Sequence, residues 1–180
     1  MKPPRSQLPP LDTVALERLA LRYVERFATT RGKLSDYLRR KIRERGWEGT
    51  PADPTALAER MAALGYVDDL AWAQGKAAAL NRRGLGARRV SGALMQARVE
   101  EADREAVAPD VAARAVEAAL AFARRKRLGP WARETLDRSS DRVAYDKQLG
   151  AMLRAGHPLD LSRRVLALPP GVDPSLDDLR

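Results

Sequence analysis

Residues 38–47 read Leu38-Arg-Arg-Lys-Ile42-Arg-Glu-Arg-Gly46-Trp47, and this helix-end motif occurs twice more in variant form. The other copies are Val90-Ser-Gly-Ala-Leu94-Met-Gln-Ala-Arg98-Val99 and Gln148-Leu-Gly-Ala-Met152-Leu-Arg-Ala-Gly156-His157. Each copy has the pattern of a helix end, and each follows a longer helix with an apolar stripe. The three ends lie about 50 to 60 residues apart, which is enough for a three-helix unit. We therefore predict an all-α protein built as an elongated tandem array of three three-helix repeats.

Around these helix-end motifs, the apolar residues of the chain recur at the spacing of α-helices. The first helix carries apolar residues at the spacing of one helix face, namely Leu16, Leu19, Ala20, Tyr23, Val24 and Phe27. Asp53-Pro54 and Asp68 are typical helix starts, and Gly46 is a typical helix end. Another helix is expected to begin at Pro109-Asp110. No segment alternates with period two, so no strand is expected.

Proline-rich ends and these start signals divide the chain. Residues 1–12 and 169–180 are expected to form a poorly ordered leader and a poorly ordered acidic tail. The three repeats are predicted over residues 13–65, 66–108 and 109–168.

The composition points to a binding protein. The chain has 44% hydrophobic and 32% charged residues, a net charge of +9 and no cysteine. Such a charge favours a polyanion or an acidic protein surface as partner, although it can also serve solubility alone. The absence of cysteine suits a reducing cytoplasm, and no apolar run is long enough to span a membrane. With His157 as the single histidine, we expect no enzyme, no metal site and no cofactor.

The first candidate binding surface is the helix that contains the first helix-end motif. Leu34, Leu38 and Ile42 form its apolar stripe, and cations occupy the opposite side and the start of the helix: Arg31, Lys33, Arg39, Arg40 and Arg43. Guanidinium groups in such a row can bind carboxylates or phosphates. The alternative is a solvated helix face without a specific partner.

Further cations flank the glycine loop of the second repeat and end a helix of the third: Arg82, Arg83, Arg88, Arg89, Arg124 and Arg125. Gly84 and Gly86 would allow a close backbone approach by an anion. The alternatives are an ordinary turn between helices and, for Arg124 and Arg125, an interaction with the helix dipole. Trp47 and Trp72 are interpreted as packing residues, whereas the role of Trp131 stays open.

Three stretches resemble the RecX family of regulators of the RecA recombinase. They are residues 20–47, the motif Leu64-Gly-Tyr-Val-Asp-Asp-Leu-Ala-Trp-Ala73, and the basic loop and helix of residues 82–94. With a weaker third unit, the resemblance covers roughly residues 13–168. The sequence departs from the family pattern where Arg98 replaces a glycine and where Gly156-His157 replaces a glycine followed by an aromatic residue.

The resemblance implies a protein that lodges in the groove of a RecA filament on DNA and usually restrains the recombinase. The expected partners are the RecA filament and single-stranded or double-stranded DNA, with the regulator acting as a monomer. The alternative is an autonomous basic helical nucleic-acid-binding protein, for example a helix-turn-helix transcription regulator.

Overall fold

The computed structural model describes residues 9–132 and 142–169, and within these ranges the protein contains helices and no strand. The expected all-α class is confirmed. The chain forms two compact units: unit 1 comprises the residues up to Trp72 together with Ala97–Glu100, and unit 2 comprises Ala73–Gln96 and the residues from Glu101 onward. None of the described helices is both long and apolar enough to cross a membrane. The division into three repeats stays a prediction.

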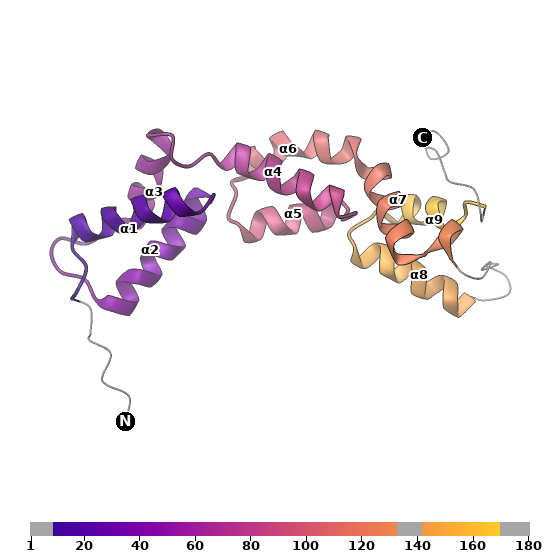
Figure 1. The fold of residues 1–180 in the computed structure, drawn as a ribbon, viewed down its shortest axis with the longest axis horizontal. Coiled ribbons are helices and arrows are strands. Elements are labelled where there is room, and N and C mark those ends of the chain that lie inside the picture. Colours follow the sequence, from indigo (N-terminus) through magenta and orange to yellow (C-terminus); the bar gives the residue numbers. More distant parts are fainter. Residues whose placement is uncertain (1–8, 133–141, 170–180) are drawn as a thin grey trace, which may run out of the picture. The chain divides into compact units, whose positions relative to one another are not determined.

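Figure 1 labels the helices in their order along the chain. Unit 1 holds α1 (Thr13–Arg26), α2 (Arg31–Arg45), α3 (Pro54–Ala63) and the start of α4 (Asp69–Arg82). Unit 2 holds the rest of α4, α5 (Ala87–Gln96), α6 (Glu101–Ala113), α7 (Ala115–Lys126), the 3-10 turn η1 (Gly129–Trp131), α8 (Arg142–Arg154) and α9 (Leu159–Leu166).

The end of the predicted leader is part of unit 1. Leu11 is fully buried in its core, and its backbone pairs with the chain on either side of Trp47. Its N–H donates to the Gly46 carbonyl at 3.0 Å, and its carbonyl accepts from the Glu48 N–H at 2.8 Å. Residues 9–12 are therefore ordered, which corrects the expectation for that part of the leader. Residues 1–8 and 170–180 lie outside the described residues.

The predicted helix starts are confirmed where an aspartate precedes the helix. The Asp53 carboxylate accepts from the N–H groups of Thr55 and Ala56 at 2.9 and 3.0 Å, with Pro54 in the first helical position. The Asp68 carboxylate accepts from the Ala71 N–H at 2.8 Å. Both carboxylates satisfy backbone donors that lack a partner within the helix.

In each of the three helix-end motifs, the residue before the last has a positive φ. Gly46, Arg98 and Gly156 have φ of +83°, +55° and +95°. At Arg98 this left-handed conformation carries a cost of roughly 1–2 kcal/mol, because its Cβ approaches the backbone. The Arg98 guanidinium bonds to the Asp36 carboxylate at 2.5 Å, which holds the residue in place. The equivalence of the three end positions in the sequence thus has a structural counterpart.

The helix start expected at Pro109 is wrong. Helix α6 continues through Pro109 to Ala113, and the next helix begins at Ala115. Val107 and Val111, on either side of the proline, are both buried. Their packing on one face carries the helix past the missing proline N–H, so tertiary contacts overrule the local signal.

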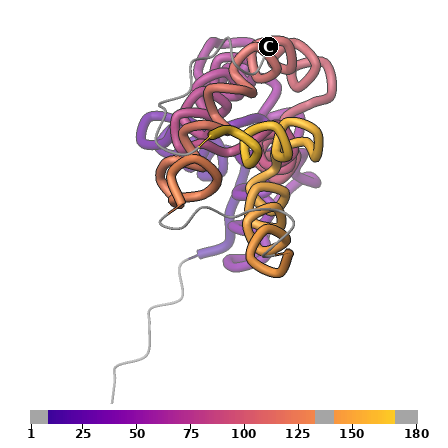
Figure 2. Tube along the Cα trace, turned by 90° about the vertical axis from the view of Figure 1, so that its right-hand side faces the viewer, coloured from indigo at the N-terminus to yellow at the C-terminus, as the bar shows by residue number. Residues whose placement is uncertain are grey.

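The core of unit 2 is rich in small residues. Phe122, Met152, Leu161 and Val165 fill it, and Ala119 lies among them. Helix α9 lies next to the C-terminal end of α8, to which a short turn connects it (Figure 2). The small side chain of Ala119 lets α7, α8 and α9 approach one another closely.

Candidate functional site

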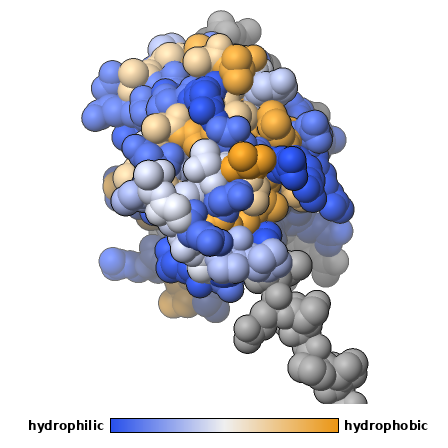
Figure 3. All heavy atoms as spheres, turned by 90° about the vertical axis from the view of Figure 1, so that its left-hand side faces the viewer, coloured by the Kyte–Doolittle hydropathy of each residue, from blue (hydrophilic) through white to orange (hydrophobic). Residues whose placement is uncertain are grey.

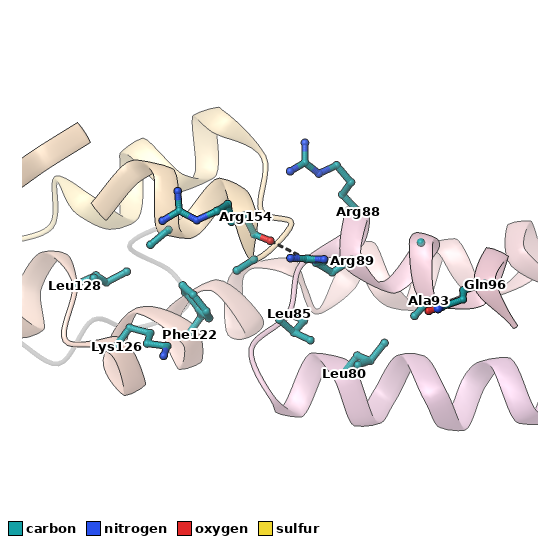
Figure 4. Close-up of a pocket in the computed structure, with 13 residues that line it drawn as sticks. Leu80, Leu85, Arg88, Arg89, Ala93, Gln96, Phe122, Lys126, Leu128 and Arg154 are labelled. Carbon is teal, nitrogen blue, oxygen red and sulfur yellow. Dashed lines mark hydrogen bonds between the residues drawn. The ribbon is translucent and has the colours of Figure 1, made fainter. Parts of the chain in front are cut away.

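A groove of about 1170 Å³ is hollowed into unit 2, and α5, α7 and α8 line most of it. Its floor is apolar and contains Leu80, Leu85, Phe122 and Leu128 (Figure 4). Its cationic residues are Arg88, Arg89, Lys126 and Arg154. No carboxylate is among its lining residues. The sequence did not lead us to expect a concave site, so the groove is a feature that only the folded chain reveals.

Arg88 and Arg89 connect α5 to the end of α8. The Arg88 Nη2 donates to the Leu153 carbonyl at 2.8 Å, and the Arg89 Nε donates to the Arg154 carbonyl at 2.7 Å. The last carbonyls of a helix lack partners within the helix and favour nearby cations. These two predicted binding residues therefore stabilise the packing of α8 while they also line the groove.

Lys126 and Arg154 complete the cationic lining and were not among the predicted binding residues. Lys126 follows Phe122 by four residues on α7, a spacing that places both on one helix face. That spacing was a usable signal in the sequence. Arg154 reaches the groove only because α8 packs against the turn before α5, which the sequence does not indicate.

Glycines in the loop before α5 are required by packing. A Cβ on Gly84 would lie 2.7 Å from the Phe122 nitrogen, and a Cβ on Gly86 would lie 2.4 Å from the Gly156 carbonyl carbon. The glycine loop thus fits the alternative of an interhelical turn, since protein backbone already occupies the space that an anion would need.

The other predicted cations of unit 2 lie outside the groove lining. Arg82, Arg83 and Arg124 are exposed. Arg125 is also exposed; its guanidinium donates to the Arg83 carbonyl and lies 5.5 Å from the centre of the Phe122 ring.

In unit 1, Arg31 is engaged by the chain's own carboxylates. Its guanidinium nitrogens lie 3.1 Å from Glu59, 3.4 Å from Asp69 and 3.2 Å from Glu100. Burial lowers the pKa of Arg31, but the hydrogen bond to Glu59 and the three negative charges outweigh burial and raise that pKa above its usual value. The predicted role of Arg31 in partner binding would require this cluster to open.

The remaining cations of α2 differ in their availability. Arg39 donates to the Thr55 hydroxyl at 2.7 Å, and the Lys33 ammonium lies 4.9 Å from the centre of the Trp72 ring. Arg40 lies 3.6 Å from Glu44 in an exposed pair, and Arg43 is exposed. Exposed pairs of this kind are weak, so Arg40 and Arg43 are the α2 cations most readily available to a partner.

Comparison with known proteins identifies a relative of this chain. Regulatory protein RecX of Myxococcus xanthus (strain DK1622) is 32% identical over 162 residues, which cover 84% of this chain and 83% of the relative. The chain belongs to the RecX family. No protein-family model matches the chain.

This RecX-family protein also carries an aromatic cluster on unit 1. The Tyr23 ring stacks on Tyr37 at 4.2 Å and lies 5.2 Å from Phe27. Arg26 and Arg40 lie 5.4 and 5.6 Å from the rings of Phe27 and Tyr37. We expected Phe27 on the apolar face of the first helix, but α1 ends at Arg26 and Phe27 is 49% exposed. Hydrophobic and hydrophilic side chains are mixed on the surface seen in Figure 3.

His157 and the tryptophans serve packing in the RecX-family chain. His157 is buried, and its Nε2 lies 3.1 Å from the Gly84 carbonyl. Burial lowers the pKa of His157, and the hydrogen bond to Gly84 only partly opposes this. Trp47 and Trp131 pack against the cores of units 1 and 2, and Trp72 is half-buried.

Proposed function

We propose that this RecX-family protein is a non-enzymatic regulator that binds the RecA filament on DNA and inhibits the recombinase. The observation that carries the proposal is its membership of the RecX family, seen in the 32% identity to a regulatory protein over most of both chains. The net charge of +9 supports a filament partner, because a DNA-bearing filament is strongly anionic. Arg40 and Arg43 are the residues of α2 that would make the first contacts.

A RecA ATPase assay on single-stranded DNA tests the proposal. Addition of the purified protein is expected to lower the rate of ATP hydrolysis, and the protein should sediment with the filament. A sample of the protein without RecA is the control for sedimentation of the protein by itself. An unchanged rate together with an absence of filament binding would contradict the proposal, whereas a higher rate would keep the partner and reverse the direction of regulation.

The aromatic cluster favours a second candidate function, autonomous binding of single-stranded nucleic acid. Bases stack on exposed aromatic rings. Phe27 is exposed at the edge of the cluster, whose other rings, Tyr23 and Tyr37, are partly buried. The cations Arg26 and Arg40 lie against this cluster. This candidate predicts binding to oligo(dT) in the absence of RecA, with steep weakening as salt increases. Phe27→Ala should then weaken that binding about tenfold, since a stacked base contributes roughly 1–3 kcal/mol. RecA-dependent binding that Phe27→Ala leaves unchanged would favour the first proposal.

A further inference from the structure

The groove of unit 2 combines two surfaces that one kind of partner can use together. Its apolar floor draws Leu80, Leu85 and Phe122 from different parts of unit 2. Its cations come from α5, α7 and α8, and no carboxylate among the lining residues offsets them. In Figure 4 Arg89 and Arg154 lie on one side of Phe122 and Leu85, and Lys126 lies beside Phe122.

The groove cations retain hydrogen-bonding capacity for a partner. A guanidinium has five N–H donors, and the bonds to the end of α8 use one donor of Arg88 and one of Arg89. These bonds hold both groups in fixed positions, so a partner carboxylate would meet donors that are already ordered. Lys126 and Arg154 add two further positive charges.

Small residues form part of the groove wall. They are Gly92 and Ala93 on α5, Ala151 on α8 and Ala155 directly after α8. A Cβ built on Gly92 would meet nothing within 4 Å, so there is open space directly above that turn of α5. Such a wall lets the backbone of a partner helix come close to the floor.

We infer that this groove binds an acidic amphipathic helix of a protein partner, with apolar side chains on the floor and carboxylates on the cations. Helix-in-groove recognition depends on this pairing of an apolar face with polar flanks. Nucleic acid fits the groove less well, because the floor is mainly aliphatic. Its one aromatic ring, Phe122, already has Arg125 and His157 against it at 5.5 and 5.7 Å. Phosphates would use the cations and leave the apolar floor without a partner.

Direct peptide binding tests the inference without RecA, so the result is independent of the proposed function. The probe is a fluorescein-labelled synthetic helix with leucines at i, i+3, i+4 and i+7 and glutamates on both flanks, measured by fluorescence anisotropy. A peptide of the same composition in scrambled order is the control for charge alone. We expect the amphipathic peptide to bind at least about tenfold more tightly, a difference of roughly 1.4 kcal/mol. Equal binding of the two peptides would overturn the inference.

Two glycines provide a matched pair of steric variants. Gly92→Leu fills the groove, whereas Gly75→Leu places the same side chain on α4 outside the groove lining. A Cβ meets nothing within 4 Å at either position, so both variants should fold. Gly92→Leu is expected to weaken peptide binding about tenfold, and Gly75→Leu should leave it unchanged. Equal affinities of the two variants would overturn the inference.

A second pair of variants separates local charge from net charge. Lys126→Glu reverses a groove cation that does not cap α8, and Arg163→Glu makes the same change in charge on an exposed face of α9. The first should weaken peptide binding several-fold more than the second. If oligo(dT) competes with the peptide and its own binding is lost in Gly92→Leu, the groove is a nucleic-acid site and the inference is wrong.

Discussion

Glycines in this chain serve opposite purposes at different positions. Gly84 and Gly86 lie against the backbone of α7 and of the turn at Gly156, with no room for a Cβ. Gly75 and Gly92 lie in helices and face open space. The same residue type is therefore required by packing in the loop and merely tolerated in the helices, where glycine lowers stability relative to alanine.

Replacement of Gly86 by alanine should destabilise the protein. The new Cβ would lie 2.4 Å from the carbonyl carbon and oxygen of Gly156, so backbone has to move. We expect the free energy of unfolding to fall by about 2–3 kcal/mol, as for overpacked sites in other cores. Urea denaturation monitored by circular dichroism measures this. Gly75→Ala is the control and should gain roughly 0.5–1 kcal/mol; similar losses in both variants would contradict the packing account.

His157 should make stability depend on pH. Burial lowers its pKa, so below the usual value of about 6.5 the unfolded chain binds a proton more readily than the folded chain. Stability is therefore fully present above pH 6.5 and falls as the pH decreases below it, by at most about 1.4 kcal/mol per pH unit.

Urea denaturation at pH 7.5 and at pH 5.5 checks the expected loss. His157→Gln cannot titrate and keeps a donor for the Gly84 carbonyl, so its loss between the two pH values should be smaller than that of the wild type. Equal losses would assign the effect to other groups.

At the scale of elements, hydrogen bonds and packing at the start of α2 connect separate segments of unit 1. The Thr30 hydroxyl donates to the Ala97 carbonyl at 2.5 Å and accepts from the Lys33 N–H at 3.2 Å. The Asp69 carboxylate, at the start of α4, accepts from the Arg31 N–H at 2.8 Å. Gly32 lets the Arg98 turn pack directly on this end of the helix. The start of α2, the start of α4 and the turn at Ala97–Arg98, which lie far apart in sequence, thus meet at residues 30–32.

Loss of the Arg31 guanidinium should weaken unit 1 more than loss of an exposed arginine on the same helix. Arg31→Met removes ion pairs to three carboxylates, of which the Asp69 side chain is only 3% exposed. We expect a loss of about 1–3 kcal/mol, because a buried charge keeps its desolvation cost when its partner is removed.

Arg40→Met is the matched control for this change on α2. It removes an exposed pair with Glu44 and should cost less than roughly 0.5 kcal/mol. Thermal unfolding of both variants provides the measurement. If Arg31→Met were as stable as Arg40→Met, the carboxylate cluster would contribute no stability.

At the scale of the whole molecule, the positive charge is spread over both units, but it is not equally available. Arg31 pairs with three carboxylates, and Arg88 and Arg89 each donate to a backbone carbonyl, whereas Arg40 makes an exposed pair with Glu44 and Arg43 and Arg82 are exposed. Some of the cations behind the net charge of +9 are therefore already engaged within the protein.

Reversal of exposed α2 charges should weaken binding to the RecA filament. Arg40→Glu combined with Arg43→Glu leaves the Arg39–Thr55 hydrogen bond intact, so helicity by circular dichroism should not change. We expect filament binding in a pull-down to fall at least about tenfold at low salt. Arg18→Glu with Arg22→Glu makes the same charge change on exposed positions of α1 and should have a smaller effect. Equal losses would indicate that net charge alone is responsible.

The candidate site was only partly predictable. Arg88 and Arg89 were expected from the glycine loop and do line the groove, but their contacts with α8 join residues 65 positions apart in the chain. Lys126 had a local signal in its spacing from Phe122, whereas Arg154 had none. Pro109 shows the reverse case, in which a local start signal was overruled by buried valines.

Helix class, the aspartate caps and the capping glycine at Gly46 were determined by the sequence itself. These features depend on interactions within about four residues, which spacing and residue type reveal directly. The groove, the carboxylate cluster around Arg31 and the choice of exposed cations were decided by tertiary structure. They arise when segments far apart in the chain pack together, and packing sets which charges the protein itself neutralises and which remain exposed.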